Sequence, residues 1–386
     1  MIVTLSGVTG TGKSFFKNTI SEELCFKNIV IVTTREKRIG EINGIDKEFD
    51  VVIAYGLREE TLSNFKDYFG KNIKFIQVEN FTRSINPKKD FKALKEIRKI
   101  VKEEKPDIVH LHSSKAGILG RLAVNGNKIK MFYNPHGFSF LKKDDSKLKR
   151  GIYWTIEKLT ACINGKCVIV GCSKGEYKEA KKLNKRAICI NNGIDIKKLA
   201  METDDIKLKG IDYENLKICT IGRIGYQKNP EMFNKIAESF PKIQFTWIGE
   251  GKLKDKLTST NVQVTGWKER KDVLQILNNS DIFVLTSLWE GLPLSLLEAM
   301  YMKKICIVSN CIGNRDVIED GKNGYVSENF GEFIDKIKKV IEDKNEKNNN
   351  IIFNAYNDVV NNYNVEIMVN KYINKYLGED DEENYN

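Results

Sequence analysis

The chain has 386 residues, which is more than a single hydrophobic core usually organises and suits two domains of roughly 200 residues or fewer each. Hydrophobic residues make up 41% and charged residues 30%, a balance that supports packed cores and excludes a globally disordered chain. The net charge of +11 suits an anionic ligand or a peripheral anionic membrane surface, although a Lys-, Asn- and Ile-rich composition gives the same excess without any ligand. No helix-turn-helix, zinc-finger or RNA-binding signature is present, so no nucleic-acid partner is expected.

The sequence carries no signal for export or membrane insertion. No apolar run approaches the roughly 20 residues that span a bilayer, and the N-terminus MIVTLSGVTGTGKS lacks the layout of a signal peptide. A cytoplasmic location is therefore expected. Three histidines and eight scattered cysteines offer no metal-ligand spacing, so we expect free thiols and no metal.

A glycine-rich loop follows the first expected strand. The run GVTGTGKS fits the Walker A pattern, in which backbone amides and a lysine bind phosphate. Residues 1–50 resemble the start of a guanylate kinase, since TTREKRIGEINGIDKEF is similar to that family's phosphate-holding segment. The resemblance stops near Phe49, before the lid that phosphoryl transfer requires, so kinase activity is not expected. The candidate phosphate contacts are Gly7, Gly10, Gly12, Lys13, Ser14, Arg35 and Arg38.

Short β-branched runs alternate with amphipathic stretches, which favours βα units, parallel sheets and an α/β fold class. The expected strands of the first half are 2–6, 28–33, 50–55, 73–77, 107–112, 130–134, 167–171 and 187–191. Those of the second half are 217–222, 244–249, 261–265, 281–286 and 304–309. The polar segment 191–213 has no clear period and is the expected inter-domain linker.

Two histidines share one strand of the first half. His110 and His112 point to the same face by the period of two, but no third ligand of suitable type is apparent, so a metal pair is rejected. Strand-end packing or cleft lining is the preferred interpretation. Ser113 and Lys115, which follow this strand, are candidate acceptor or phosphate contacts.

A strand of the second half runs into SLWEGLPLSLLEA, a strand-to-helix turn. Pro293 fits the first turn of the helix, and Gly291 lets the backbone approach a ligand. The helix amino end attracts an anion such as a diphosphate. Glu290 and Glu298 bracket this end, and carboxylates bind sugar or ribose hydroxyls well.

A second strand-to-helix turn, TIGRIGYQKNPEMF, has the same design. Asn229 is the expected N-cap and Pro230 the first helical residue. Arg223 and Lys228 flank the loop and suit a pair of phosphates, where they replace a metal ion. Two such loops at the carboxyl ends of strands in one sheet favour a ligand site, although each acid or base alone fits a solvated surface equally well.

These segments together resemble glycosyltransferase family 4. The resemblance covers roughly residues 50–375 and rests on GRIGYQKNP, on the region ending SLWEGLPLSLLEAM with two glutamates eight positions apart, and on DVIEDGKNGYV. PDIVHLHSSKAGILGRLA, HGFSF and NNGID carry it into the first half, where they resemble enzymes that assemble capsule, exopolysaccharide or lipopolysaccharide. The family implies GT-B architecture, in which two Rossmann-like domains face a cleft, with retention and without a metal or other cofactor.

The resemblance also assigns roles. Arg223 and Lys228 would hold the donor diphosphate, and Glu298 would bind the ribose. Glu290 would contact the donor sugar near the reacting carbon. His136, in the HGFSF turn, would touch the sugar from across the cleft. The donor loop would consist of Gly291, Leu292 and Pro293.

The expected domain division follows from these segments. Residues 1–195 form an acceptor-side Rossmann-like domain, and residues 196–360 form the nucleotide-sugar domain. Residues 361–378 form a helix that packs back on the first domain, and residues 379–386 are a disordered acidic tail.

The expected function is retaining transfer of a hexose or N-acetylhexosamine from a nucleotide sugar, a UDP-sugar above all, to a lipid-linked or polysaccharide acceptor. One alternative is a P-loop nucleotide-binding or guanylate-kinase-like protein, and another is a non-catalytic scaffold that binds nucleotide sugar. Residues 1–50 themselves fit a structural substitute for the first βα unit, a phosphate loop of the cleft, or an independent nucleotide site.

Overall fold

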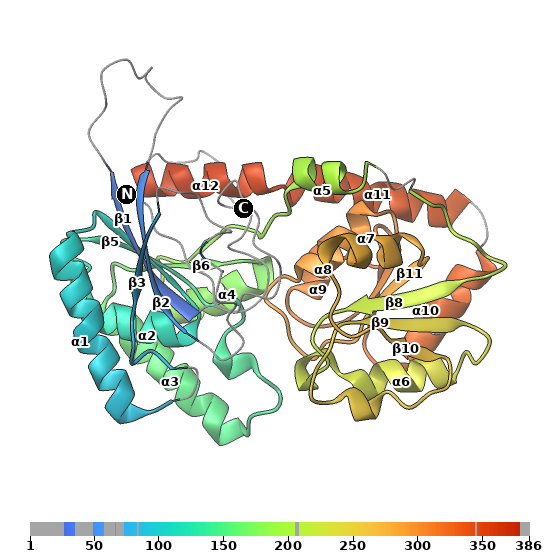
Figure 1. Ribbon diagram of the computed structural model, residues 1–386, viewed down its shortest axis with the longest axis horizontal. Helices are drawn as coiled ribbons and strands as arrows, with labels where there is room; N and C mark the ends of the chain where they lie inside the picture. Colours follow the sequence, from blue (N-terminus) through green and yellow to red (C-terminus); the bar gives the residue numbers. More distant parts are fainter. Residues whose placement is uncertain are drawn as a thin grey trace, which may run out of the picture. The chain divides into compact units, whose positions relative to one another are not determined.

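The computed structural model describes residues 27–34, 49–57, 66, 73–82, 85–204, 208–343 and 346–378. Several sequence predictions lie outside these residues: the strand at 2–6, the acidic tail, and all seven candidate phosphate contacts between Gly7 and Arg38. The described chain forms two compact α/β units (Figure 1). The first comprises the described residues up to Leu141 together with Lys147–Ile190 and 369–378, and the second comprises Lys142–Ser146 and Asn191–Met368.

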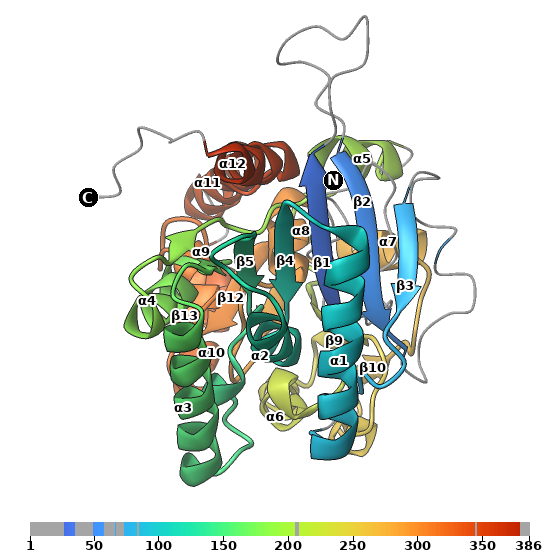
Figure 2. The same ribbon diagram turned by 90° about the vertical axis from the view of Figure 1, so that its left-hand side faces the viewer.

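The first unit is built on a seven-stranded sheet of order β3-β2-β1-β4-β5-β6-β7. Figure 2 shows β3, β2, β1, β4 and β5 side by side in this order. The strands are β1 Lys27–Thr34, β2 Phe49–Gly56, β3 Ile73–Gln77, β4 Ile108–His112, β5 Lys130–Asn134, β6 Val168–Gly171 and β7 Ile188–Cys189. The helices are α1 Pro87–Glu104, α2 Ser114–Ala123, α3 Lys147–Ile163, α4 Lys174–Leu183 and the second half of α12 Val365–Leu377.

Strand β1 departs from the predicted parallel sheet. It pairs antiparallel with both β2 and β4, whereas β2 with β3 and β4 through β7 are parallel. Alternating apolar and amphipathic segments do not by themselves set strand direction, and antiparallel neighbours need no helical crossover between them. The predicted parallel arrangement therefore does not hold for β1, although it holds for the other pairs of this sheet.

Helices cover the two faces of the first sheet according to the alternation of its side chains. Leu111 and Tyr133 face α2, where Gly120 and Gly117 leave no room for a Cβ. His110 of β4 and Phe132 of β5 point to the opposite face, and the ring of Tyr376 from α12 lies against both of them. The second half of α12 is therefore one of the layers of this unit.

The second unit is a six-stranded, wholly parallel sheet of order β10-β9-β8-β11-β12-β13. The strands are β8 Lys217–Ile221, β9 Gln244–Ile248, β10 Val262–Val264, β11 Ile282–Leu285, β12 Ile305–Ser309 and β13 Tyr325–Ser327. The helices are α5 Ile196–Glu202, α6 Pro230–Glu238, α7 Arg270–Asn278, α8 Leu294–Tyr301, α9 Asn314–Val317, α10 Phe330–Glu342 and α11 Glu346–Asn362. Central strands such as β11 are buried along their whole length, as expected for a sheet covered on both faces.

Two local expectations in this unit need correction. The segment 191–213, expected to be an irregular linker, contains α5, whose amino end is capped by Asp195 through the amide of Lys198 at 2.9 Å. Strand β13 was not among the predicted strands. The five strands predicted for this half are confirmed as β8 to β12, with small differences at their ends. No helix in the described ranges is long and apolar enough to span a bilayer.

Candidate functional site

The loop between β11 and α8 carries the two predicted carboxylates. Pro293 has ψ of 123° and lies at the N-cap, so α8 begins one residue later, at Leu294. The prediction that Pro293 belongs to the first helical turn was therefore wrong by one position, since its extended ψ is not helical. Glu290 in the loop and Glu298 in the fifth position of α8 are both buried.

The loop between β8 and α6 was predicted accurately. Asn229 caps α6 with its side chain accepting from the amide of Met232 at 3.4 Å, and Pro230 is the first helical residue. Gly222 follows β8 and has φ of 146°, and an added Cβ would lie 2.9 Å from Cε of Lys228. The glycine therefore makes the space that the lysine side chain occupies. Arg223 follows it and is exposed.

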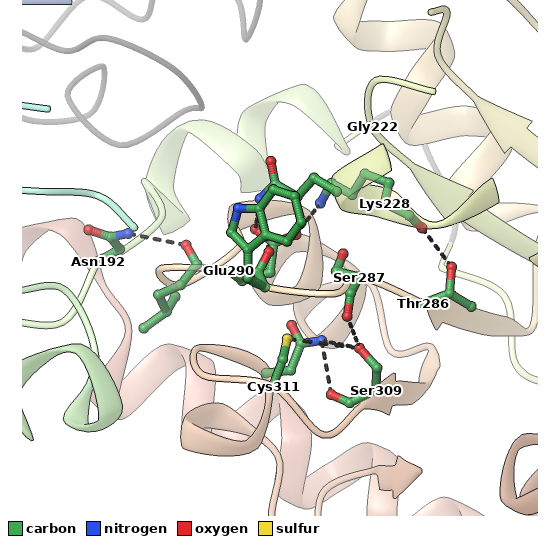
Figure 3. A network of polar contacts seen from close by, with 12 residues as sticks. Asn192, Gly222, Lys228, Thr286, Ser287, Glu290, Ser309 and Cys311 are labelled. Carbon is green, nitrogen blue, oxygen red and sulfur yellow. Dashed lines mark hydrogen bonds and ion pairs between the residues drawn. The ribbon is translucent and has the colours of Figure 1, made fainter. Parts of the chain in front are cut away.

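The two loops are joined by an ion pair. Nζ of Lys228 lies 2.8 Å from Oε1 of Glu290, and both side chains are largely buried (Figure 3). Gln227 donates to Oε2 of the same carboxylate at 3.3 Å and to the carbonyl of Trp289 at 2.9 Å. Burial strengthens the Coulomb attraction between the two charges relative to a surface salt bridge. The loss of either partner would be costly, because it would leave the other charge buried and unpaired.

Backbone contacts fix the position of these side chains. Thr286 donates through Oγ1 to the carbonyl of Lys228 at 2.7 Å (Figure 3). The amide of Leu288 donates to the carbonyl of Gln227 at 2.8 Å. From the start of the second unit, Asn192 donates to the carbonyl of Leu292 at 3.1 Å. The loop is thus held at both ends, so the ion pair lies on a rigid frame.

Gly313 lets two loops of the site approach closely. Gly313 has φ of 87°, and an added Cβ would lie 2.5 Å from the carbonyl oxygen of Gly291 and 3.1 Å from Cβ of Glu290. Any larger residue at position 313 would therefore press on the acid of the ion pair. The sequence offered no specific signal for this position.

Glu298 forms the second ion pair of the site. Its Oε1 lies 2.8 Å from an NH2 nitrogen of Arg270, the first residue of α7. Nε of Arg270 also contacts Glu202 at 3.3 Å. Sequence analysis missed Arg270, Gln227 and Asn192, because their roles arise from contacts between residues 28 to 100 positions apart.

The candidate residues of the first unit gather at the carboxyl ends of β4 and β5. His136 has φ of 50°, in the left-handed region that few non-glycine residues occupy. Its Nε2 lies 2.8 Å from Nδ1 of His112. The His112 ring stacks on those of His110 and His136, with centroids 4.2 and 5.1 Å apart, so the three histidines of the chain form one row. The prediction that His110 and His112 share a face is confirmed.

His110 and His112 are buried and His136 is half-buried, and desolvation disfavours the charged form of all three. Burial lowers the pKa of His110 to about 3 and that of His136 to about 4. Burial, followed by the charges of the two neighbouring histidines, also lowers the pKa of His112. Nε2 of His110 lies 2.5 Å from Oδ1 of Asn134, and its Nδ1 contacts the hydroxyl of Tyr376. Because Asn134 accepts through Oδ1, His110 carries its proton on Nε2 and Tyr376 donates to Nδ1.

Ser113 and Lys115, the candidate acceptor contacts, lie at the start of α2. Ser113 is the N-cap residue with φ of 80°, and its buried Oγ has no hydrogen-bond partner among the described residues. Nζ of Lys115 lies 2.5 Å from Asp90 of α1 and 3.2 Å from Oγ1 of Thr82. The lysine is therefore held by its own unit, whereas the serine hydroxyl keeps its hydrogen-bonding capacity.

Two family models together match most of the described chain. The family model "Glycosyl transferases group 1" matches residues 201–358, and "Glycosyltransferase Family 4" matches residues 46–198. The UDP-Gal:alpha-D-GlcNAc-diphosphoundecaprenol alpha-1,3-galactosyltransferase of Escherichia coli is 32% identical, over 81% of this chain and 85% of its own length. The N,N'-diacetylbacillosaminyl-diphospho-undecaprenol alpha-1,3-N-acetylgalactosaminyltransferase of Campylobacter jejuni is 25% identical, over 88% of this chain and 94% of its own.

Solved structures share the fold at low identity. Sucrose-phosphate synthase from Thermosynechococcus elongatus has a TM-score of 0.67 at 14% identity and covers 80% of this chain and 84% of its own. Anabaena HepE in complex with UDP and glucose has a TM-score of 0.64 at 15% identity, with 83% and 90% covered. Neither matched family region reaches residues 1–45, so these matches give no support to a guanylate-kinase-like start. The chain belongs to the family 4 type of GT-B glycosyltransferases and is itself a glycosyltransferase.

Proposed function

We propose that the chain transfers a hexose or N-acetylhexosamine from a UDP-sugar to a lipid-linked saccharide during cell-surface polysaccharide synthesis, with retention of anomeric configuration. The names of the Escherichia coli and Campylobacter jejuni relatives specify sugar-diphosphoundecaprenol acceptors, and the first also specifies a UDP-sugar donor. The observation that carries the proposal is the buried Lys228–Glu290 pair between two loops at the carboxyl ends of β8 and β11. Open α/β sheets bind their ligands at this edge.

Four charged groups of the second unit receive a proposed role in holding the donor. Lys228 and Arg223 bind the diphosphate beside the amino end of α6, where free amides and the helix dipole also favour an anion. Glu290 binds hydroxyls of the sugar, with Gly291, Leu292 and Pro293 forming its loop. Glu298, oriented by Arg270, binds the ribose hydroxyls. When the donor arrives, its phosphate competes with Glu290 for the Lys228 ammonium.

The proposed reaction is a same-face displacement. The acceptor hydroxyl oxygen forms a bond to the anomeric carbon while the bond from that carbon to the phosphate oxygen breaks. The acceptor proton passes to an oxygen of the leaving diphosphate, so atoms and charges balance without an enzymic nucleophile. Arg223 and Lys228 stabilise the charge that develops on the diphosphate, which is the role of a metal ion in other transferases.

The first unit contributes two neutral groups, His136 and Ser113, and one lysine to the proposed reaction. His136 contacts the donor sugar, and its lowered pKa keeps the imidazole uncharged, so that it exchanges hydrogen bonds with hydroxyls without repelling the cations that hold the diphosphate. Ser113 binds an acceptor hydroxyl or phosphate through its unpartnered Oγ. Lys115 adds a positive charge close by in sequence, in the first turn of α2.

The decisive experiment supplies the purified chain with a panel of UDP-hexoses and UDP-N-acetylhexosamines and a synthetic sugar-diphospho-undecaprenol. We expect transfer with an α donor to give an α product by NMR, at a rate unchanged by EDTA. An inverted product would refute retention, and loss of activity with EDTA would refute metal independence. Binding of UDP-sugar without transfer or hydrolysis, tested with membrane extracts as acceptors, would instead establish a non-catalytic scaffold.

For residues 1–50, we propose a structural substitute for the first βα unit of the first domain. The Walker A run motivates the competing function, a nucleotide site of its own. Phosphorylation of GMP by ATP that Lys13→Ala abolishes would establish that competing function. Loss of sugar transfer in Lys13→Ala, with the thermal midpoint unchanged, would show instead that the loop serves the transferase.

A further inference from the structure

A buried glutamate lies between two strand ends of the first unit. Glu176 is the third residue of α4 and is completely buried. Its amide donates to Oγ of Ser173, the N-cap residue, at 3.2 Å, so the start of the helix is fixed. The helix dipole favours a carboxylate here, but a buried charge persists only where polar groups compensate it. The groups that bind this carboxylate therefore indicate its role.

Both oxygens of the carboxylate accept hydrogen bonds from the main chain. Oε2 accepts from the amide of Cys172, which directly follows β6, at 2.8 Å. Oε1 accepts from the amide of Gly137, in the turn after β5, at 2.5 Å. Because hydrogen bonds to an ionised group are about twice as strong as neutral ones, Glu176 fastens these two segments to the start of α4.

The bond to Gly137 holds a turn with unusual backbone angles. His136 has φ of 50° and Gly137 has φ of 90°, so two consecutive residues lie in the left-handed region. A histidine there is strained and stays only where its surroundings fix it. The Gly137 amide belongs to the planar peptide group that follows His136, so holding it fixes the direction in which the backbone leaves the histidine. Glu176 thus restrains His136 through the main chain, while His112 contacts its Nε2 at 2.8 Å.

The second unit has a similar carboxylate that holds no site residue. Asp281, the buried residue before β11, accepts from the amides of Asp212 at 2.9 Å and Lys217 at 2.7 Å. Neither amide belongs to a residue of the candidate site, and Asp281 lies at the amino end of its strand. A buried carboxylate between two amides is therefore not functional by itself, and the turn that it holds makes the difference at Glu176.

We propose that Glu176 is a positioning residue for sugar transfer, which holds the turn of His136 in the conformation that presents the imidazole to the donor sugar. The inference rests on the proposed function, in which His136 contacts that sugar. Glu176 itself is completely buried, and both of its oxygens accept from the main chain. It therefore acts through the turn and does not touch the substrate.

The first test replaces Glu176 by glutamine, which keeps the size of the side chain but turns one oxygen into a donor that faces a main-chain amide. We expect Glu176→Gln to lower kcat about thirtyfold and to leave the affinity for UDP unchanged, because UDP lacks the sugar that His136 contacts. The matched control is Asp281→Asn, which loses a main-chain hydrogen bond in the same way. It should lower the thermal midpoint similarly and leave kcat unchanged. An equal loss of kcat in the control would overturn the inference.

A second readout reports on His136 directly and does not depend on sugar transfer. The chain has three histidines, so protein made with isotope-labelled histidine gives a few imidazole NMR signals that single substitutions assign. Glu176→Gln should shift the signals of His136 and of His112, whose ring nitrogens are in contact. The signals of His110, which makes its hydrogen bonds elsewhere, should stay in place. Unmoved His136 signals would overturn the inference.

A double-variant cycle separates this inference from the proposed function. If Glu176 acts through His136, Glu176→Gln should lower kcat no further in a His136→Ala background, and an equal loss in both backgrounds would overturn the inference. Full activity of His136→Ala would instead refute the donor contact in the proposed function, and with it the kinetic role of Glu176. Shifted His136 signals would in that case still establish that Glu176 holds the turn.

The wild-type protein supplies a test even if Glu176→Gln does not fold. The amide of Gly137 should exchange with deuterated water roughly a hundredfold more slowly than an open amide, because it donates to a buried carboxylate. Selective labelling of glycine makes this signal accessible to NMR. Exchange at the rate of an open amide would show that the carboxylate does not hold the turn and would overturn the inference.

Discussion

The two units place different chemistry at the carboxyl ends of their strands. In the second unit, the loops after β8 and β11 carry a buried ion pair, Lys228–Glu290, and α8 carries another in Glu298–Arg270. In the first unit, the corresponding edge carries the histidine row, held neutral by burial. The proposed function assigns the charged groups of the second unit to a diphosphate and the uncharged histidines of the first unit to sugar hydroxyls.

This difference indicates that the fold determines where each site lies, at the carboxyl ends of the strands, and that the side chains there determine its chemistry. A cation near a leaving diphosphate stabilises developing negative charge, whereas a protonated histidine beside a reacting sugar would oppose the positive charge that develops there. The contrast makes definite predictions, because removing a charge from the second unit should slow transfer far more than removing a hydrogen bond from the first.

The largest effect is expected at Lys228. Lys228→Ala should lower kcat about a thousandfold, because the leaving diphosphate loses its buried cation. The measurement is steady-state transfer, with Lys256→Ala, an exposed lysine of the same unit, as the control. Since the substitution also leaves Glu290 unpaired, the double variant Lys228→Gln with Glu290→Gln should recover thermal stability but not activity. Recovery of both would show that the lysine acts only on the fold.

Acid should destabilise the protein through the histidine row. In the unfolded chain the histidines take up protons below about pH 6.5, whereas in the folded protein their lowered pKa values prevent this. The three histidines therefore leave the free energy of unfolding unchanged above pH 6.5 and reduce it as the pH falls below that value. At one pH unit below 6.5, the three histidines together lower the free energy of unfolding by roughly 4 kcal/mol. Urea unfolding at pH 7.5 and 5.5 measures the change. His136→Asn, which tolerates the positive φ, should reduce it by about a third; an identical change in this variant would contradict the assignment.

Removal of the Glu298 charge should have a smaller effect. Glu298→Gln should lower kcat/KM for the donor about a hundredfold, since a carboxylate binds two neighbouring ribose hydroxyls and Arg270 more strongly than an amide does. Thermal shift with UDP should weaken in parallel. The control is Glu231→Gln, an exposed glutamate on α6. Unchanged donor affinity would remove Glu298 from the nucleotide site.

The smallest effect is expected at His112, which touches His136 and not the donor in this proposal. His112→Leu should lower kcat about tenfold and leave the affinity for UDP unchanged, because only the orientation of His136 is lost. His112→Asn should retain most activity, since its amide nitrogen takes the place of Nδ1. Equal kinetics for the two variants would mean that the 2.8 Å contact has no part in positioning.

Much of the second unit could be predicted from sequence because its signals are local. The N-cap at Asn229, the proline at the start of α6 and the buried strands each depend on a few consecutive residues. The same holds for the identification of Lys228, Glu290 and Glu298 as neighbours of two helix amino ends. Strand direction at β1 and the helix within the expected linker were not predicted, since no local pattern fixes the first and the second is one short helix.

Local sequence patterns are enough to predict the α/β class, the family and the charged residues of the loops after β8 and β11, because periodicity, capping and motif spacing are properties of adjacent positions. Tertiary structure alone decided that Lys228 pairs with Glu290, that Arg270 orients Glu298 and that three histidines separated by up to 26 positions stack in one row. It also decided that the carboxylate of Glu176 accepts from the amide of Gly137, which lies 39 positions earlier in the chain. Such contacts depend on packing between distant elements, and packing has no local signature in the chain.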